Sequence, residues 1–345
     1  MADGENDLIL DVKNLEVKFY HDQGVVSAVN GVDFNIGEGQ SIGFVGESAC
    51  GKTVTASTVL RILPPSGDII NGTINFRDTS GQIKDLAQYD SDSSELRKIR
   101  GNDIAMIFQE PMTAFSPVHT LYNQISEAIL LHQDLPQKEV RARVINLLDQ
   151  VGIPEPEERV DDYSFEFSGG MRQRAMIAMA LACEPRILIA DEPTTALDVT
   201  IQAQVLKLIK DMQQDYGLSL HLITHDLGVI AHMVDYVYIM YLGRIVEKGP
   251  IQEVFLDPKH PYTRDLLGSI PSIKGVEGKI ASIQGSVPDA YHMPPGCSFH
   301  PRCRDVVGDK CSSAVPQSVE IEPEHYTSCY KYTDRGVKEN VKHVR

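Results

Sequence analysis

The pattern of apolar and polar positions along the chain predicts an α/β protein that begins with an antiparallel β layer. Residues 8–18 alternate as a half-buried strand does, and residues 25–36 repeat the pattern after a turn. Largely apolar segments, typical of strands buried on both faces, are found at residues 41–45, 104–108, 186–190 and 218–224. Further strand patterns are found at residues 71–76, 83–89, 236–240 and 243–248.

Helical segments are interspersed with these strands. The chain has stretches of helix length at residues 54–63, 95–100, 168–183 and 199–216. Residues 118–152 are predicted to be mostly helical. Their clearest amphipathic stripe consists of Val140, Val144, Leu147, Leu148 and Val151. We expect this region to be an insertion between two halves of the core.

One stretch predicts phosphate binding. Residues 46–53 follow the pattern G-x-x-x-x-G-K-T and lie between a buried strand and a helix. In that context the backbone N–H groups and the helix dipole hold phosphate oxygens. Lys52 is expected to reach the β- and γ-phosphates, and the Thr53 hydroxyl to ligate Mg²⁺. The residues assigned to this phosphate-binding loop are Gly46, Glu47, Ser48, Ala49, Cys50, Gly51, Lys52 and Thr53.

Polar residues follow three other buried strands. Asp191 and Glu192 end the strand at 186–190, which predicts Asp191 as a Mg²⁺ ligand and Glu192 as the general base for a lytic water. Gln109 follows the strand at 104–108 and is either a ligand of Mg²⁺ or the water, or a loop amide without a role. His225 follows the strand at 218–224, where a histidine either senses the γ-phosphate or orients the water, or is structural.

A second anion site is predicted at the start of the helix near residue 168. Ser168 is placed as an N-cap, and Gly169 and Gly170 let a backbone approach closely, although an ordinary capped helix has the same residues. Asp198 is expected to cap the helix at 199–216. Phe19 either stacks on an adenine ring or is a strand core residue, and the residues alone favour the core.

Charge and length narrow the class of protein. The chain has 345 residues and a formal net charge of −16, which argues against non-specific binding to nucleic acid. Its longest apolar run, residues 175–183, is far shorter than the roughly 20 residues that span a membrane. The first residues are acidic and hold no apolar signal segment. We therefore expect a cytosolic protein that contacts a membrane only through a partner.

The cysteines are unevenly distributed. Of six, Cys50 and Cys183 stand alone, whereas Cys297, Cys303, Cys311 and Cys329 cluster near the C-terminus with the spacing C-x5-C-x7-C-x17-C. In a cytosolic chain such a cluster favours a metal site over disulfides. Four thiolates can hold either a tetrahedral Zn²⁺ or an iron–sulfur cube, and the spacing alone does not separate the two.

Taken together, the motifs resemble the ATPase subunit of an ABC transporter. In chain order they are Phe19 (A-loop), residues 46–53 (Walker A), Gln109 (Q-loop), residues 167–173 (signature), Asp191 and Glu192 (Walker B), Asp198 (D-loop) and His225 (H-loop). The sequences F-Q-E-P-M at 108–112, H-P-Y-T at 260–263 and P-G-C-S-F-H-P-R-C at 295–303 are similar to the dipeptide and oligopeptide importer branch. In members with all four C-terminal cysteines, that extension binds a 4Fe–4S cluster.

The resemblance implies an architecture and a set of partners. The expected fold is a P-loop ATPase core with an antiparallel β subdomain and a helical subdomain near residues 111–175, together forming residues 1–270. Residues 271–345 are expected to form a small, loop-rich, metal-binding extension. ATP would lie between the Walker A loop of one subunit and the Ser168 signature of a second, similar ATPase subunit. Two membrane permeases and an extracytoplasmic binding protein would complete a peptide importer at the cytoplasmic face of the membrane.

This interpretation leaves two alternatives for the activity. Related importers carry nickel or oligosaccharides, and a rival class is a soluble ABC ATPase that acts on nucleic acid or ribosomes, which the acidic charge and short insertion disfavour. The sequence also departs from the family pattern at two positions, Ala49 and Met171, the latter in place of the usual glutamine of the signature. Ala49 occupies a position that is usually glycine. Alanine fits there if its φ is negative and costs about 1 kcal/mol or more if φ is positive.

Overall fold

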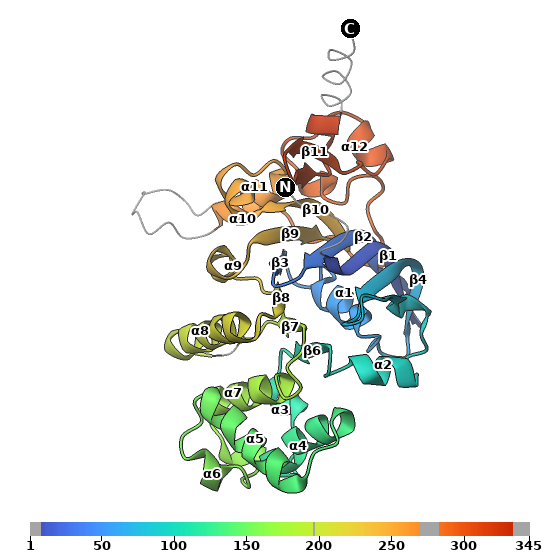
Figure 1. Cartoon of the computed structure of the whole chain (residues 1–345). Coiled ribbons are helices and arrows are strands. Elements are labelled where there is room, and N and C mark those ends of the chain that lie inside the picture. Colours follow the sequence, from blue (N-terminus) through green and yellow to red (C-terminus); the bar gives the residue numbers. More distant parts are fainter. Residues whose placement is uncertain (1–7, 196, 270–282, 334–345) are drawn as a thin grey trace. The chain divides into compact units, whose positions relative to one another are not determined.

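The computed structural model describes residues 8–195, 197–269 and 283–333 (Figure 1). These residues form two compact units. The first unit comprises residues 8–9, 36–41 and 76–223, without 196, and the second comprises the other described residues, 10–35, 42–75, 224–269 and 283–333. In the described residues no helix is both long and apolar enough to cross a membrane.

The first unit contains three neighbouring parallel strands. They are β6 (Ile104–Ile107), β7 (Ile187–Asp191) and β8 (Ser219–Ile223), with β7 in the middle. The register pairs Ile104 with Ile187, and Ile187 with Ser219. All residues of β7 and β8 are buried, as the largely apolar segments predicted. Because the strands are parallel and in register, Asp191 is placed at the same edge as the end of β6.

Helices make up most of the rest of the first unit. They are α2 (Ser94–Ile99), α3 (Pro111–Ala114), α4 (Leu121–His132), α5 (Gln137–Gln150), α6 (Pro156–Arg159), α7 (Gly169–Ala180) and α8 (Val199–Tyr216). In Figure 1, α3 to α7 gather into one helical cluster, in which α4, α5 and α7 pack on one another. The predicted stripe on α5 is buried, which confirms the amphipathic pattern.

The second unit holds the β layer and the phosphate-binding segment. The β layer contains β1 (Leu8–His21), which lies between β2 (Gly24–Gly37) and β4 (Gly67–Arg77). The two-residue connection makes β1 and β2 antiparallel. Strand β3 (Ser41–Val45) is followed by α1 (Lys52–Val59) and pairs in parallel with β9 (Tyr236–Tyr241). Helix α9 (Leu227–Met233) precedes β9.

The C-terminal segment extends the sheet of the second unit. Strand β10 (Arg244–Pro250) pairs antiparallel with β9 and with β12 (His325–Thr327), and β12 pairs with β11 (Val319–Glu322). The helices of this part are α10 (Ile251–Leu256), α11 (Pro261–Gly268) and α12 (Lys310–Ser313). Strand pairing therefore joins the cysteine-bearing segment to β10.

Several expected boundaries were wrong, and two of them have a clear local cause. The strand expected at residues 83–89 ends as β5 (Ile83–Asp85), because Leu86–Gln88 form a 3-10 turn capped by the Asp85 side chain. The helix expected to reach residue 63 ends at Val59, because Arg61 has a φ of 54° and the Ile62 N–H donates to the Ser57 carbonyl. The N-terminal residues 1–7 and the last twelve residues, which the predicted domains include, lie outside the described part.

Candidate nucleotide site

The phosphate-binding loop lies between β3 and α1, as predicted, and two of its glycines are required by the packing around them. A Cβ on Gly46 would lie 2.2 Å from the Met240 carbonyl oxygen. Gly51 has a φ of 103°, and a Cβ there would lie 2.4 Å from the Ala28 carbonyl oxygen. The backbone of this loop therefore passes too close to its neighbours for any side chain at either position.

Ala49 has a positive φ, which is the strained one of the two conformations considered for this position. Its φ is 61°, in the left-handed region, where an L-residue with a Cβ costs about 1 kcal/mol or more. The loop therefore keeps the conformation that a glycine would have adopted without strain.

Lys52 is turned toward the loop. Its Nζ donates to the carbonyl oxygens of Gly46, at 2.8 Å, and Glu47, at 3.1 Å, and the residue is only 6% exposed. Thr53 follows in the first turn of α1 and is exposed. The amine is thus held by the first two carbonyl groups of the loop, and a phosphate oxygen can replace a carbonyl as its partner.

Glu47 is bonded through both its backbone and its side chain. Its N–H donates to the Tyr262 hydroxyl oxygen at 2.8 Å. Its carboxylate accepts two hydrogen bonds from Arg302, at 2.6 and 3.1 Å. The bond to Glu47 raises the pKa of Arg302 above its usual value, so the guanidinium stays charged although its side chain is only 4% exposed.

In the first unit, Gln109 and Glu192 are brought together. The Gln109 Nε2 donates to Glu192 Oε2 at 3.1 Å, and the Thr195 hydroxyl donates to the same oxygen at 2.8 Å. Glu192 has a φ of 46°, an uncommon conformation that is found at functional sites. Asp191, beside it at the end of β7, is 2% exposed. Two donors on one oxygen orient the carboxylate.

The signature serine caps a helix, as predicted. Ser168 Oγ accepts from the Met171 N–H at 3.3 Å at the start of α7. Gly169 is exposed, and a Cβ there would meet no atom within 4 Å, whereas a Cβ on Gly170 would lie 2.9 Å from Ile201. Packing within the described chain therefore explains Gly170 but does not explain Gly169.

The remaining predicted residues occupy turns and a half-buried strand position. Asp198 Oδ1 accepts from the N–H groups of Thr200 and Ile201, both at 3.0 Å, so it caps α8 as expected. His225 is exposed in the turn before α9. Phe19 is half-buried against Gly67 instead of being a core residue.

The four C-terminal cysteines share one small module. The Asp305 N–H donates to Cys303 Sγ and the Val307 N–H to Cys311 Sγ, both at 3.3 Å, and the Cys297 N–H donates to the Cys311 carbonyl at 2.8 Å. Burial raises the pKa of Cys303 to about 11, and the neighbouring thiols of Cys329 and Cys311 raise it in the same direction. Within residues 8–195, 197–269 and 283–333, however, no group of three or more His, Cys, Asp or Glu side chains is placed to hold a metal ion.

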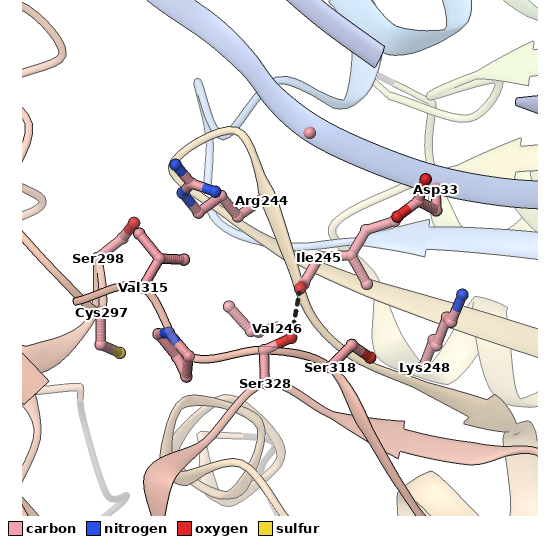
Figure 2. A pocket seen from close by; sticks show the side chains of 12 residues that line it. Asp33, Arg244, Ile245, Val246, Lys248, Cys297, Ser298, Val315, Ser318 and Ser328 are labelled. Atoms are coloured by element: carbon pink, nitrogen blue, oxygen red, sulfur yellow. Dashed lines mark hydrogen bonds between the residues drawn. The ribbon is translucent and has the colours of Figure 1, made fainter. Parts of the chain in front are cut away.

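A pocket of about 160 Å³ lies between this module and β10 (Figure 2). Arg244, Lys248 and Asp33 contribute its charged side chains, and Cys297 lies at one end. The Ser328 hydroxyl donates to the Ile245 carbonyl at 3.3 Å across its floor. No residue of the phosphate-binding loop lines it, so it is separate from the nucleotide site.

Sequence reasoning missed three residues that contact the predicted site: Thr195, Tyr262 and Arg302. Tyr262 belongs to the H-P-Y-T motif, which was noted only as a mark of a family. Pro261 begins α11, and His260 caps it by accepting from the Tyr262 N–H at 3.1 Å. The motif thus sets the start of the helix that delivers the Tyr262 hydroxyl to the loop.

Comparisons with known proteins agree with the motifs. A family model described as "ABC transporter" matches residues 29–195, and one described as "Oligopeptide/dipeptide transporter, C-terminal region" matches residues 246–311. The chain is 44% identical to the oligopeptide transport ATP-binding protein AppD of Bacillus subtilis, over 96% of this chain and 99% of that protein. It is 46% identical to the dipeptide transport ATP-binding protein DppD of the same organism, over 95% and 96% of the two chains.

Solved structures share the fold. A dimeric ATP-binding cassette in a post-hydrolysis state, bound to ADP and Pi, is 23% identical, with a TM-score of 0.62 over 70% of this chain and 98% of that one. The structure of cbiO1 from Clostridium perfringens, part of an ABC transporter complex, is 29% identical, with a TM-score of 0.60 over 73% and 92% of the two chains.

Proposed function

Since the chain belongs to the ATP-binding subunits of the oligopeptide and dipeptide ABC transporters, we propose that it couples ATP hydrolysis to the uptake of short peptides. The observation that carries this proposal is the 44–46% identity to peptide-transport ATP-binding proteins over nearly the whole of both chains. The C-terminal match adds to it, because residues 246–311 lie beyond the cassette match. The choice of peptide would be made by the subunits that contact it, not by the ATPase subunit.

The residues assigned to ATP binding and hydrolysis are those of the sequence motifs. Gly46 to Thr53 would hold the phosphates of ATP through backbone N–H groups and Lys52. Glu192 would accept a proton from the attacking water, and the hydrogen bonds from Gln109 and Thr195 fix the direction of its carboxylate. His225 is assigned to the γ-phosphate and Phe19 to the adenine ring, because each is accessible to a ligand.

The oxygen atoms of Thr53, Asp191 and Gln109 are hard ligands of the kind that Mg²⁺ prefers, so the residues present fit this ion. When bound, Mg²⁺ would neutralise developing charge on the phosphate oxygens.

A second ATPase subunit of the same kind would complete the nucleotide site. The support is the exposed Ser168–Gly169 turn, in which packing within the described chain gives no reason for Gly169. A backbone N–H at an exposed helix start can approach a phosphate of an ATP molecule bound to the neighbouring subunit. Asp198 would lie at the same interface. Two permeases and a peptide-binding protein would be the other partners, and the chain would be held at the cytoplasmic face of the membrane through the permeases.

An iron–sulfur cluster is proposed for Cys297, Cys303, Cys311 and Cys329. The chemistry of the donors fits, because four thiols lie in one module and two of their sulfurs accept backbone N–H groups, as the sulfurs of such clusters do. When bound, the cluster would cross-link a segment that has few other elements of regular structure. Zn²⁺ is the less favoured occupant.

Transport in a reconstituted system tests the proposed function. The chain is assembled in proteoliposomes with its permeases and second ATPase subunit, and ATP hydrolysis is measured with binding protein that carries a short peptide. We expect peptide-loaded binding protein to stimulate hydrolysis and peptide to accumulate. Stimulation by nickel or an oligosaccharide, with none by peptides, would contradict the peptide assignment.

A further inference from the structure

Glu47, the second residue of the phosphate-binding loop, is held from three directions within the second unit. Tyr262 accepts its N–H, Lys52 donates to its carbonyl, and Arg302 clamps its carboxylate. The first and third partners come from the C-terminal part of the chain. Arg302 is 255 positions away from Glu47 in the sequence.

Arg302 is itself fixed in place. Its Nε donates to the Gln284 carbonyl at 3.0 Å, and its Nη1 also donates to the Tyr241 hydroxyl at 3.2 Å. The guanidinium carbon lies 5.8 Å from the ring centre of Tyr241 and 6.0 Å from that of Phe299. A planar guanidinium with donors committed on two sides presents its remaining N–H groups to Glu47 in a fixed fork.

Two of the clustered cysteines flank the turn that carries Arg302. Arg302 lies in the 3-10 turn His300–Arg302, which follows Cys297 by two residues and directly precedes Cys303. Phe299, fully buried before this turn, packs on Tyr241 and Tyr262 with ring centres 5.2 and 5.4 Å apart. The C-terminal module therefore reaches the phosphate-binding loop through one aromatic cluster and one ion pair.

We propose that Arg302 is a positioning residue for ATP binding, through which the C-terminal module holds the start of the phosphate-binding loop. The inference rests on the proposed role of residues 46–53 in phosphate binding. Arg302 acts in two ways. It fixes the backbone at Glu47, whose carbonyl bonds Lys52, and it neutralises a carboxylate that would otherwise repel the triphosphate.

The test compares ATP affinity among variants of the full chain in the presence of Mg²⁺. Arg302→Met keeps the length of the side chain and removes its charge and donors, and we expect its Kd for ATP to rise about tenfold, or 1.4 kcal/mol. The KM for ATP should rise with it, while kcat at saturating ATP stays within about twofold, because the affected interaction is made before the chemical step. Arg302→Lys keeps the charge but not the forked pair of donors. Its Kd for ATP should therefore lie between that of the unaltered chain and that of Arg302→Met.

Controls separate positioning from general damage. Arg304→Met changes an exposed arginine of the same segment and should bind ATP as the unaltered chain does. The double variant Glu47→Gln with Arg302→Met should recover part of the lost affinity, because the repelling carboxylate is gone. Wild-type affinity in Arg302→Met, or no recovery in the double variant, would overturn the inference. If Lys52→Ala leaves ATP binding intact, the phosphate-loop assignment fails instead.

Discussion

His325 and Glu247 form a fully buried pair. The His325 Nε2 and Glu247 Oε1 lie 2.8 Å apart, and neither side chain has any exposed surface. The pair joins β12 to β10 across 78 positions of sequence. Glu247 also accepts the N–H groups of Lys259 at 2.7 Å and His260 at 2.9 Å. One carboxylate thus ties the C-terminal strand and the turn before α11 to the sheet.

Removing Glu247 should destabilise the second unit. Glu247→Leu leaves His325 and two backbone N–H groups buried without their acceptor, so we expect the free energy of unfolding to fall by about 3 kcal/mol or more. Denaturant unfolding followed by circular dichroism measures the change. Glu253→Gln, at an exposed position of α10, is the matched control. A loss below about 1 kcal/mol in Glu247→Leu would show that the pair contributes little.

Stability should fall as the pH drops through the acid side of neutrality. Burial lowers the pKa of His260 to about 4, below its ordinary value. As the pH falls below about 6.5, the unfolded chain takes up the proton before the folded chain does, so the free energy of unfolding falls until about pH 4. At about 1.4 kcal/mol for each pKa unit, the contribution is a few kcal/mol at most.

The variant His260→Asn isolates that contribution. Asparagine can still cap α11, so the helix start is kept while the titrating group is removed. Unfolding curves recorded between about pH 7 and pH 4 should be flatter for the variant than for the unaltered chain. Part of the dependence should remain, because burial also lowers the pKa of His221 to about 3. Parallel curves for the two proteins would contradict the assignment.

Ala49 should tolerate glycine and reject a branched residue. At a φ of 61°, Ala49→Gly relieves about 1 kcal/mol of strain but gives the unfolded chain a similar amount of freedom, so the stability should stay within about 1 kcal/mol. Ala49→Val places a β-branched side chain in a conformation that such residues avoid, so we expect a larger loss of stability and weaker ATP binding. Thermal unfolding and ATP titration check both variants. Equal stability of the valine and glycine variants would exclude strain at this position.

Glu192→Gln should separate binding from hydrolysis. Glutamine keeps the shape of the side chain and can keep a bond from Thr195, but it cannot take the proton of the attacking water. We expect kcat to fall at least about 100-fold with a Kd for ATP that changes less than about threefold. Single-turnover hydrolysis and ATP titration give the two values. A variant that hydrolyses ATP at the original rate would remove Glu192 as the base.

The cysteine module should contain iron and sulfide when the protein is purified without oxygen. We expect a broad charge-transfer band in the visible spectrum, and loss of that band and of the iron in Cys303→Ser. Cys183→Ser, outside the module, should keep both. Metal analysis that finds zinc alone would replace the cluster by a Zn²⁺ site.

Local sequence was sufficient to predict many of the elements and the residue types of the site. The strands β6, β7 and β8 end within a residue or two of the expected positions, because largely apolar segments bounded by polar residues have few other ways to be buried. Ser168 and Asp198 cap the helices they were expected to cap, since a cap depends on residues two or three positions away. The glycine, lysine and threonine pattern of residues 46–53 is likewise a local feature, and its position between β3 and α1 was predicted from the residues beside it.

Contacts between distant residues were decided only by the tertiary structure. No spacing rule pairs Arg302 with Glu47 or His325 with Glu247, because each contact depends on how β9, β10 and the C-terminal module pack together. The φ of Ala49 was likewise open, since alanine fits two conformations and the surrounding loop selects one. The sequence by itself determined which groups can bind a phosphate. Packing between residues far apart in the sequence decided which other groups hold the phosphate-binding groups in place. The reason is that a buried charge is stable only beside a partner, and the tertiary structure determines which partner is near.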